Sequence, residues 1–164
     1  MIKYLSGMKD FMLNPKEYST TGNQEIDGVL NYMLQKANET LNQVDVQINI
    51  PEDLYFNNFN ICVILGNLVD NAVREASKSK EKLLTIKMQI KQEVLLIFIE
   101  NSYSGKILEK RNGLQTTQPE LAIHGIGLEN VKKVVIANGG EIKIDYTSNR
   151  FCVQVLLYMS RIKN

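Results

Sequence analysis

The sequence is poor in the residues from which disulfide frameworks and zinc sites are built. It has only two cysteines, Cys62 and Cys152, and they lie far apart in apolar stretches. This usage is typical of reduced, buried thiols in a cytoplasmic protein, and it offers no zinc-ligand spacing. We therefore expect neither a disulfide-stabilised fold nor a structural zinc site.

Long apolar runs and an excess of either charge are also missing. No run approaches the roughly 18 residues of a membrane span, and the N-terminal MIKYLSGMKDF has too little apolar content for a signal peptide. Lysine and arginine total 19, against 18 aspartate and glutamate residues. We therefore expect a cytoplasmic chain that does not itself span the membrane and has no nucleic-acid partner, so that any phosphate binding is local.

The stretch 61–79 predicts a helix with two contrasting faces. Apolar side chains recur on one face, at Ile61, Leu65, Leu68, Val69, Ala72 and Ala76. The opposite face carries Asn67 and Asn71 one turn apart, with Arg74 a further turn on. Asparagine is a mediocre helix former. The pair is therefore either a solvated face or a ligand site, in which amide oxygens hold a cation such as magnesium and the arginine faces phosphate.

The rest of the chain predicts a mixture of helices and hairpins within one domain of 164 residues. One amphipathic helix follows capping candidates at 21–23, and another covers 128–138 before two glycines. Alternating apolar residues predict strands over 44–50, 84–90, 94–99, 141–146 and 151–158. The run 94–99 is apolar throughout, as in a strand that is central or covered on both sides.

This order of elements favours the α+β class over a doubly wound fold. We expect a two-layer sandwich, with one mostly antiparallel sheet covered by helices on one face. Residues 102–123 show no period and are interpreted as a long loop, which in a compact domain is normally functional. Its polar composition predicts a mobile lid.

Gly125 and Gly127 stand where this loop is expected to enter the next helix. Bare amides at a helix N-terminus can receive phosphate, although glycines at a helix entry also have ordinary structural uses. The Rossmann fingerprint fails, because its third glycine would fall at Asn130 and no strand precedes the motif. No Walker A lysine-serine or lysine-threonine pair exists either.

Three motifs in a fixed order carry a resemblance to a known family. NLVDNAVREA, ENSYSG and HGIGLENV resemble the N box and the two glycine boxes of the GHKL superfamily, whose ATP-binding domain is shared by gyrase, Hsp90, MutL and sensor histidine kinases. TGNQEIDGVLNYML resembles the helix that precedes this domain in the AgrC-type quorum-sensing peptide-receptor kinases. The resemblance covers roughly residues 21–158 and implies the Bergerat fold, with ATP and Mg²⁺ as cofactors.

The resemblance implies one set of ATP-binding residues, with Asn71 as the magnesium ligand. The positions that match the family's motifs are Asn67, Asn71, Arg74, Asn101, Gly105, Gly125, Ile126, Gly127 and Leu128.

Four positions depart from the family's pattern. Asn101 replaces the aspartate that receives the adenine amino group; its oxygen can accept the same bond, but its amide nitrogen can clash with a donor. Tyr103 replaces the first glycine of its box, and Asn149-Arg150 replace a glycine-threonine pair.

A further departure concerns the type of reaction. Gyrase-like and Hsp90-like ATPases have a glutamate base four residues before the metal asparagine, where this sequence has Asn67. An amide cannot take a proton from water, whereas transfer to a neutral histidine nitrogen relies mainly on positioning and magnesium. The substitution therefore favours a histidine kinase over a hydrolase.

The single histidine, His124, lies inside the second glycine box and is a poor candidate for the phosphoacceptor. We therefore expect no catalytic residue in this chain. Residues 1–43 would be the linker and helix that follow a missing phosphoacceptor region, and 44–164 the ATP-binding domain. The expected partners are ATP, upstream dimerisation and phosphoacceptor helices, and a response regulator. Two alternatives stay open: a stand-alone regulatory kinase or anti-sigma-type switch, and a pseudokinase module that binds no nucleotide.

Overall fold

The structure is a computed structural model that describes residues 21–53, 56–104 and 118–158. The predicted N-terminal connector, Gly105 and most of the predicted lid lie outside these residues. None of the helices described here is long and apolar enough to cross a bilayer.

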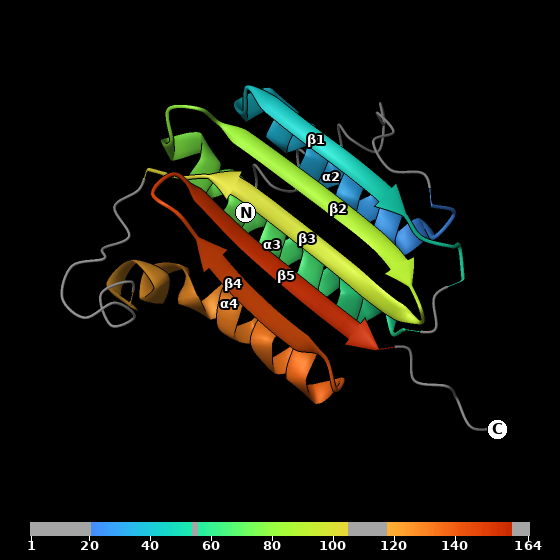
Figure 1. Cartoon of the computed structure of the whole chain (residues 1–164). Coiled ribbons are helices and arrows are strands. Elements are labelled where there is room, and N and C mark those ends of the chain that lie inside the picture. Colours follow the sequence, from blue (N-terminus) through green and yellow to red (C-terminus); the bar gives the residue numbers. More distant parts are fainter. Residues whose placement is uncertain (1–20, 54–55, 105–117, 159–164) are drawn as a thin grey trace, which may run out of the picture.

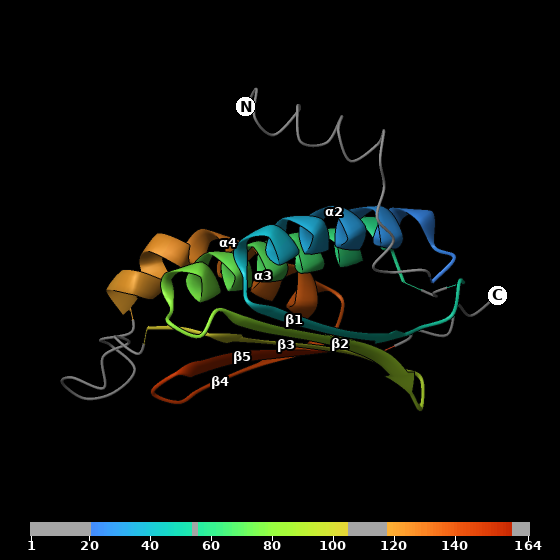
Figure 2. The same cartoon turned by 90° about the horizontal axis from the view of Figure 1, so that it is seen from above.

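Five strands form one sheet, and three helices cover one of its faces (Figures 1 and 2). The strand order is β1-β2-β3-β5-β4, and only the β1–β2 pair is parallel. The elements are α2 (Gln24–Thr40), β1 (Gln43–Asn49), α3 (Asn58–Lys78), β2 (Leu83–Lys91), β3 (Val94–Ser102), α4 (Gln118–Ala137), β4 (Glu141–Tyr146) and β5 (Arg150–Tyr158). The predicted α+β sandwich with a mostly antiparallel sheet is confirmed.

The core lies between the two layers, with α3 flanked by α2 and α4 (Figure 2). The predicted apolar face of α3 is buried, and Ile61, Leu65 and Val69 have no exposed surface. Burial of such a side chain contributes about 1.5–3 kcal/mol. α2 adds Ile26 and Leu30 to the same core. α2 belongs to the predicted N-terminal part that ends at residue 43, and it packs against α3 on the same core.

β3 is central in the sheet, but only one of its faces is covered by described elements. Leu95, Ile97 and Ile99 are buried under the helices, whereas Leu96 and Phe98 lie half-buried on the opposite face. The continuous apolar run thus reflects its central position, one of the two expected explanations.

Two tight connections make this sheet possible. Gln92 and Glu93 join β2 to β3 with φ of 51° and 65°, which is the left-handed geometry of a type I′ turn without its favoured residues. α4 ends as predicted, with Gly139 at φ 70° and the Gly140 amide donating to the Val135 carbonyl at 2.8 Å. This geometry is a Schellman-type stop.

The start of α4 differs from the sequence prediction. The helix begins at Gln118, so the interpretation of 118–123 as loop and of Gly125 as a loop-to-helix entry was wrong. Pro119 stands in the first turn, where a missing N–H costs nothing, and the following PELA contains strong helix formers. Glycines inside a helix cost about 1 kcal/mol each. That cost lowers the helix propensity of this segment, so the sequence did not predict a helix there, but it does not prevent the helix from forming.

Candidate functional site

The polar face of α3 meets α4 at the two asparagines. A Cβ atom on Gly127 would stand 3.2 Å from Asn71 Nδ2 and 3.3 Å from Asn67 Oδ1. The structure therefore brings together Asn67, Asn71 and Gly127, which come from two separate sequence motifs. This close approach explains why position 127 is a glycine.

The two amides are held in different ways. Asn67 Nδ2 donates to the Val63 carbonyl one turn earlier, at 2.8 Å, so its oxygen is the atom nearer to Gly127. Asn71 Oδ1 accepts from Arg74 Nη2 at 3.1 Å. Its Nδ2 is buried and has no hydrogen-bond partner among the described residues. An orphaned polar atom costs about 1–3 kcal/mol, and a donor such as this Nδ2 is satisfied by a water molecule or by an acceptor atom of a ligand.

Asp70, which was not among the predicted site residues, holds the Arg74 guanidinium beside Asn71. Arg74 Nη2 lies 2.7 Å from Asp70 Oδ2, in an ion pair between exposed side chains. Exposed pairs of this kind contribute little to stability. Asp70 therefore acts mainly on where the guanidinium points, and the i, i+4 spacing on a helix was the available signal.

The end of β3 carries the second part of the predicted site. Asn101 is only 3% exposed and faces the helix layer. Its Nδ2 donates to the Ser102 carbonyl at 2.9 Å. Ser102 is in turn fixed to the C-terminal end of α3, since its Oγ lies 2.7 Å from the Oγ of Ser79, the residue that caps the helix.

Tyr103, which stands at a glycine position of the expected motif, is a buried structural link. Its hydroxyl donates to the Thr147 carbonyl, and its ring packs edge-on against Phe151 at 6.2 Å between centroids. Its amide donates to the Asn149 carbonyl at 3.2 Å. These bonds join the end of β3 to the β4–β5 hairpin. This role was not visible in the sequence, because the partners lie more than forty residues away in the chain.

Residues 56–158 match the family described as the GHKL domain. The chain belongs to the GHKL domain family. The matched region includes the asparagine helix, the end of β3 and the start of α4. Membership implies an ATP-binding domain.

Several solved histidine kinase structures share this fold. The Acinetobacter baumannii histidine kinase AdeS aligns with a TM-score of 0.63 and 18% identity, over 98% of this chain and 76% of that one. The mycobacterial sensor histidine kinase MprB aligns at 0.55 and 16%, over 81% and 93%. The catalytic domain of the histidine kinase ThkA aligns at 0.60 and 16%, over 88% and 96%. No curated protein matches the sequence. At these identities the likeness shows the fold.

The other predicted residues of this GHKL domain lie in α4. Gly125, Ile126 and Leu128 all fall within the helix, as does His124. Leu128 is 6% exposed and belongs to the core, so its side chain supports the α3–α4 contact.

A metal at this site would depend on amide oxygens and phosphate. The described residues contain no group of three or more histidine, cysteine or acidic side chains that could hold an ion. Magnesium commonly uses one or two protein oxygens, with water and substrate phosphates completing its shell. Asn71 Oδ1 is an oxygen of this kind and fits that requirement once Arg74 Nη2, which now donates to it at 3.1 Å, turns away. The orphaned Nδ2 is a donor and suits a phosphate oxygen rather than the ion.

The end of the sheet near Asn101 is fastened by an exposed charged contact. Glu81 Oε2 accepts from Arg150 Nη2 at 2.7 Å, and Glu81 Oε1 accepts from Asn149 Nδ2 at 3.3 Å. The hydrogen bond from Arg150 holds the pKa of the Glu81 carboxyl below its usual value. The two residues that replace the family's glycine-threonine pair therefore bind the hairpin to the α3–β2 connection.

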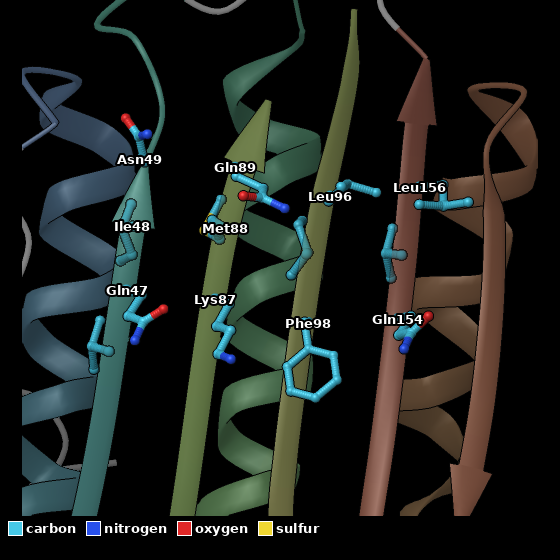
Figure 3. Close-up of a pocket in the computed structure, with 13 residues that line it drawn as sticks. Gln47, Ile48, Asn49, Lys87, Met88, Gln89, Leu96, Phe98, Gln154 and Leu156 are labelled. Carbon is cyan, nitrogen blue, oxygen red and sulfur yellow. The ribbon is translucent and has the colours of Figure 1, made fainter. Parts of the chain in front are cut away.

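A large groove lies on the open face of the sheet, away from these residues (Figure 3). It measures about 840 Å³, and its lining includes Leu96, Phe98 and Leu156. The Lys87 ammonium stands 5.7 Å from the centre of the Phe98 ring. None of the predicted ATP-binding residues lines it. The groove is therefore separate from the predicted nucleotide site.

Proposed function

We propose that this GHKL domain is the catalytic ATP-binding part of a two-component sensor histidine kinase. It would transfer the γ-phosphoryl of Mg-ATP to a histidine on a helix upstream of this chain. The observation that carries the proposal is the close approach of Asn67 and Asn71 to Gly127, together with the buried Asn71 Nδ2, which has no hydrogen-bond partner among the described residues. A pair whose donors were all bonded would leave none for a nucleotide phosphate.

Each residue of the pair has a proposed task. Asn71 would hold Mg²⁺ through Oδ1, and Arg74, which now donates to that oxygen at 3.1 Å, would turn its guanidinium to the phosphates. Bound magnesium would neutralise charge on the phosphate oxygens. Gly127 would let the α4 backbone come close to the phosphates, because it has no Cβ.

Asn67 bears on the choice between phosphotransfer and hydrolysis. Its Nδ2 is committed to the Val63 carbonyl, and an amide oxygen does not accept a proton from water near neutral pH. A neutral imidazole needs no base to attack phosphorus. The proposed site therefore suits a histidine acceptor better than water, which also argues against a stand-alone regulatory kinase of the anti-sigma type.

The wider assignment extends the same proposal. We propose that residues 1–43 connect this domain to upstream dimerisation and phosphoacceptor helices, and that 44–164 form the catalytic unit. A response regulator would receive the phosphoryl group. The motif TGNQEIDGVLNYML supports an AgrC-type quorum-sensing receptor, with this part of the protein in the cytoplasm.

A pseudokinase that binds no nucleotide is the second candidate. It is favoured by Tyr103, which fills a glycine position with a buried ring, and by Arg150, which is committed to Glu81. Both changes restrict the movement of the backbone near the end of β3, where the adenine base of ATP is expected to bind.

Calorimetry with ATP decides between the two candidates. The histidine kinase predicts saturable heat with ATP and magnesium at millimolar concentration, and a weaker, magnesium-independent signal in Asn71→Ala. Asn38→Ala is the control for removal of an asparagine side chain from a helix, because Asn38 lies in α2 and bonds the Leu34 carbonyl one turn earlier, away from the proposed site. Absence of heat from the wild-type protein would establish the pseudokinase.

A further inference from the structure

The orientation of the Asn101 amide determines which purine the proposed site can read. Adenine carries an amino group at position 6, which donates, whereas hypoxanthine and guanine carry an oxygen there, which accepts. An aspartate can only accept, but an asparagine can present either atom. Replacement of the usual aspartate by Asn101 therefore keeps adenine selectivity only if the amide cannot turn over.

The structure gives this amide one orientation. Asn101 Nδ2 lies 2.9 Å from the Ser102 carbonyl oxygen. A carbonyl oxygen only accepts, so the atom that faces it must be the nitrogen. No described residue donates to Oδ1, which is left available to an external donor. Turning the amide over would put two acceptors together in a buried site, where Asn101 is 3% exposed.

The Ser102 carbonyl is itself immobilised from the α3 side. Ser102 is 1% exposed, and its Oγ accepts from the Leu83 amide at 2.8 Å and pairs with Ser79 Oγ at 2.7 Å. The end of β3 is thus tied to the end of α3 and to the start of β2.

Tyr103 fixes the end of β3 from the side of the β4–β5 hairpin. It bonds the Thr147 and Asn149 carbonyls and packs on Phe151, all in or beside the β4–β5 hairpin. A glycine here would leave the backbone after Asn101 free to rotate. A buried tyrosine with two bonds to a hairpin removes that freedom.

We propose that Tyr103 is a positioning residue for base recognition. By fixing the end of β3 against the hairpin, it keeps the Ser102 carbonyl on Asn101 Nδ2 and so makes Asn101 present its oxygen to the 6-amino group of adenine. The site then rejects 6-oxo purines, although it lacks the aspartate. This inference rests on the proposed function, since it requires that the base binds at Asn101.

The test compares affinities for ATP and inosine triphosphate, which carries the 6-oxo group on the same ribose triphosphate. We expect the wild-type protein to bind ATP about tenfold more tightly or better, because the wrong base leaves a buried acceptor pair. Tyr103→Gly should bring this ratio close to one. Tyr103→Phe, which keeps the ring and loses the hydroxyl that bonds Thr147, should reduce it partly.

Two further variants separate positioning from general loss of structure. Asn101→Asp in the Tyr103→Gly background should restore the preference for ATP, because a carboxylate accepts in either orientation. Tyr146→Phe removes a hydroxyl from the neighbouring strand, where Tyr146 pairs with Phe151, and should leave the ratio unchanged.

The outcomes keep the two proposals apart. A wild-type protein that binds neither nucleotide refutes the proposed function and this inference with it. If the wild-type protein binds ATP and inosine triphosphate equally well, the inference is overturned. It is also overturned if the wild-type protein prefers ATP and both Tyr103→Phe and Tyr103→Gly keep that preference. In either case the proposed magnesium site at Asn71 is unaffected.

Discussion

Gly127 of α4 lies against Asn71 of α3 so closely that a Cβ atom on the glycine would stand 3.2 Å from the asparagine Nδ2. Asn67 Oδ1 would be 3.3 Å from the same atom. Few real Cβ contacts are this tight, so the two helices can keep their separation here only with a glycine. The proposed metal ligand is thus positioned by a contact between helices as well as by its own helix.

We predict that Gly127→Ala weakens binding of Mg-ATP at least severalfold while the protein stays folded. The added methyl group must push the asparagine side chains aside by a few tenths of an ångström, and Asn71 then loses its place beside α4. Calorimetric titration measures the affinity, and circular dichroism checks the fold.

Gly28→Ala is the control for helix propensity. Gly28 lies in α2, and a Cβ there would meet nothing within 4 Å. This variant should gain about 0.5–1 kcal/mol of stability and bind ATP like the wild type. Unchanged affinity in Gly127→Ala would show that the α3–α4 contact does not position Asn71.

The sequence predicted the elements well where periodicity alone decides them. The buried face of α3 and the alternation in β4 and β5 follow from side-chain spacing, and the structure reproduces both within a few residues. The start of α4 was missed because Gly125 and Gly127 lower local helix propensity, while the contact with α3 that accommodates Gly127 is not visible in the sequence.

The sequence predicted which residues belong to the candidate site, but it did not predict the long-range contacts that hold them. Asn67, Asn71 and Arg74 could be placed on one face from helix geometry. The link from Tyr103 to Thr147 depends on how the β4–β5 hairpin meets β3, a pairing between segments 44 positions apart. Spacing along the chain contains no signal for such a contact, so Tyr103 was visible only as a departure from a motif.

A stability prediction concerns the end of α4. Gly140→Ala should lower the free energy of unfolding by about 1–3 kcal/mol, since its Cβ would come within 2.4 Å of the Leu156 carbonyl oxygen. The backbone of β5, which is paired with β3 and β4 on its two sides, cannot move aside cheaply. Urea unfolding measures the change, with Gly66→Ala as the control because that Cβ meets nothing within 4 Å. Equal stability of the two variants would contradict this account of the turn.

A pH prediction concerns the Cys152 thiol. Burial, followed by the negative charges of Glu100 and Asp145, raises its pKa from 9.0 to about 11. Because the folded-state pKa is the higher one, the thiol's contribution to stability is complete below pH 9 and is lost as the pH rises through about 11. In Cys62→Ser, alkylation by iodoacetamide should therefore be slow at pH 8 and reach half its maximal rate near pH 11. A midpoint near pH 9 would mean that water reaches the thiol.

The last prediction is that this chain binds ATP and does not phosphorylate itself. Its single histidine, His124, lies in α4 only three residues before Gly127. Phosphoryl transfer needs a nucleophile roughly in line with the γ-phosphorus and the leaving oxygen. A residue of the same helix that is proposed to approach the phosphates cannot readily reach that line, whereas a histidine on a separate upstream helix can.

Incubation with γ-labelled ATP should give no acid-labile label on this chain. A longer chain that includes the upstream sequence should become labelled, and replacement of its added histidine should remove the label. His124→Ala in the longer chain is the matched control and should keep it. Stable labelling of the short chain that disappears in His124→Ala would instead place the acceptor in α4, because no other histidine is present. The chain would then need no upstream helix for the transfer.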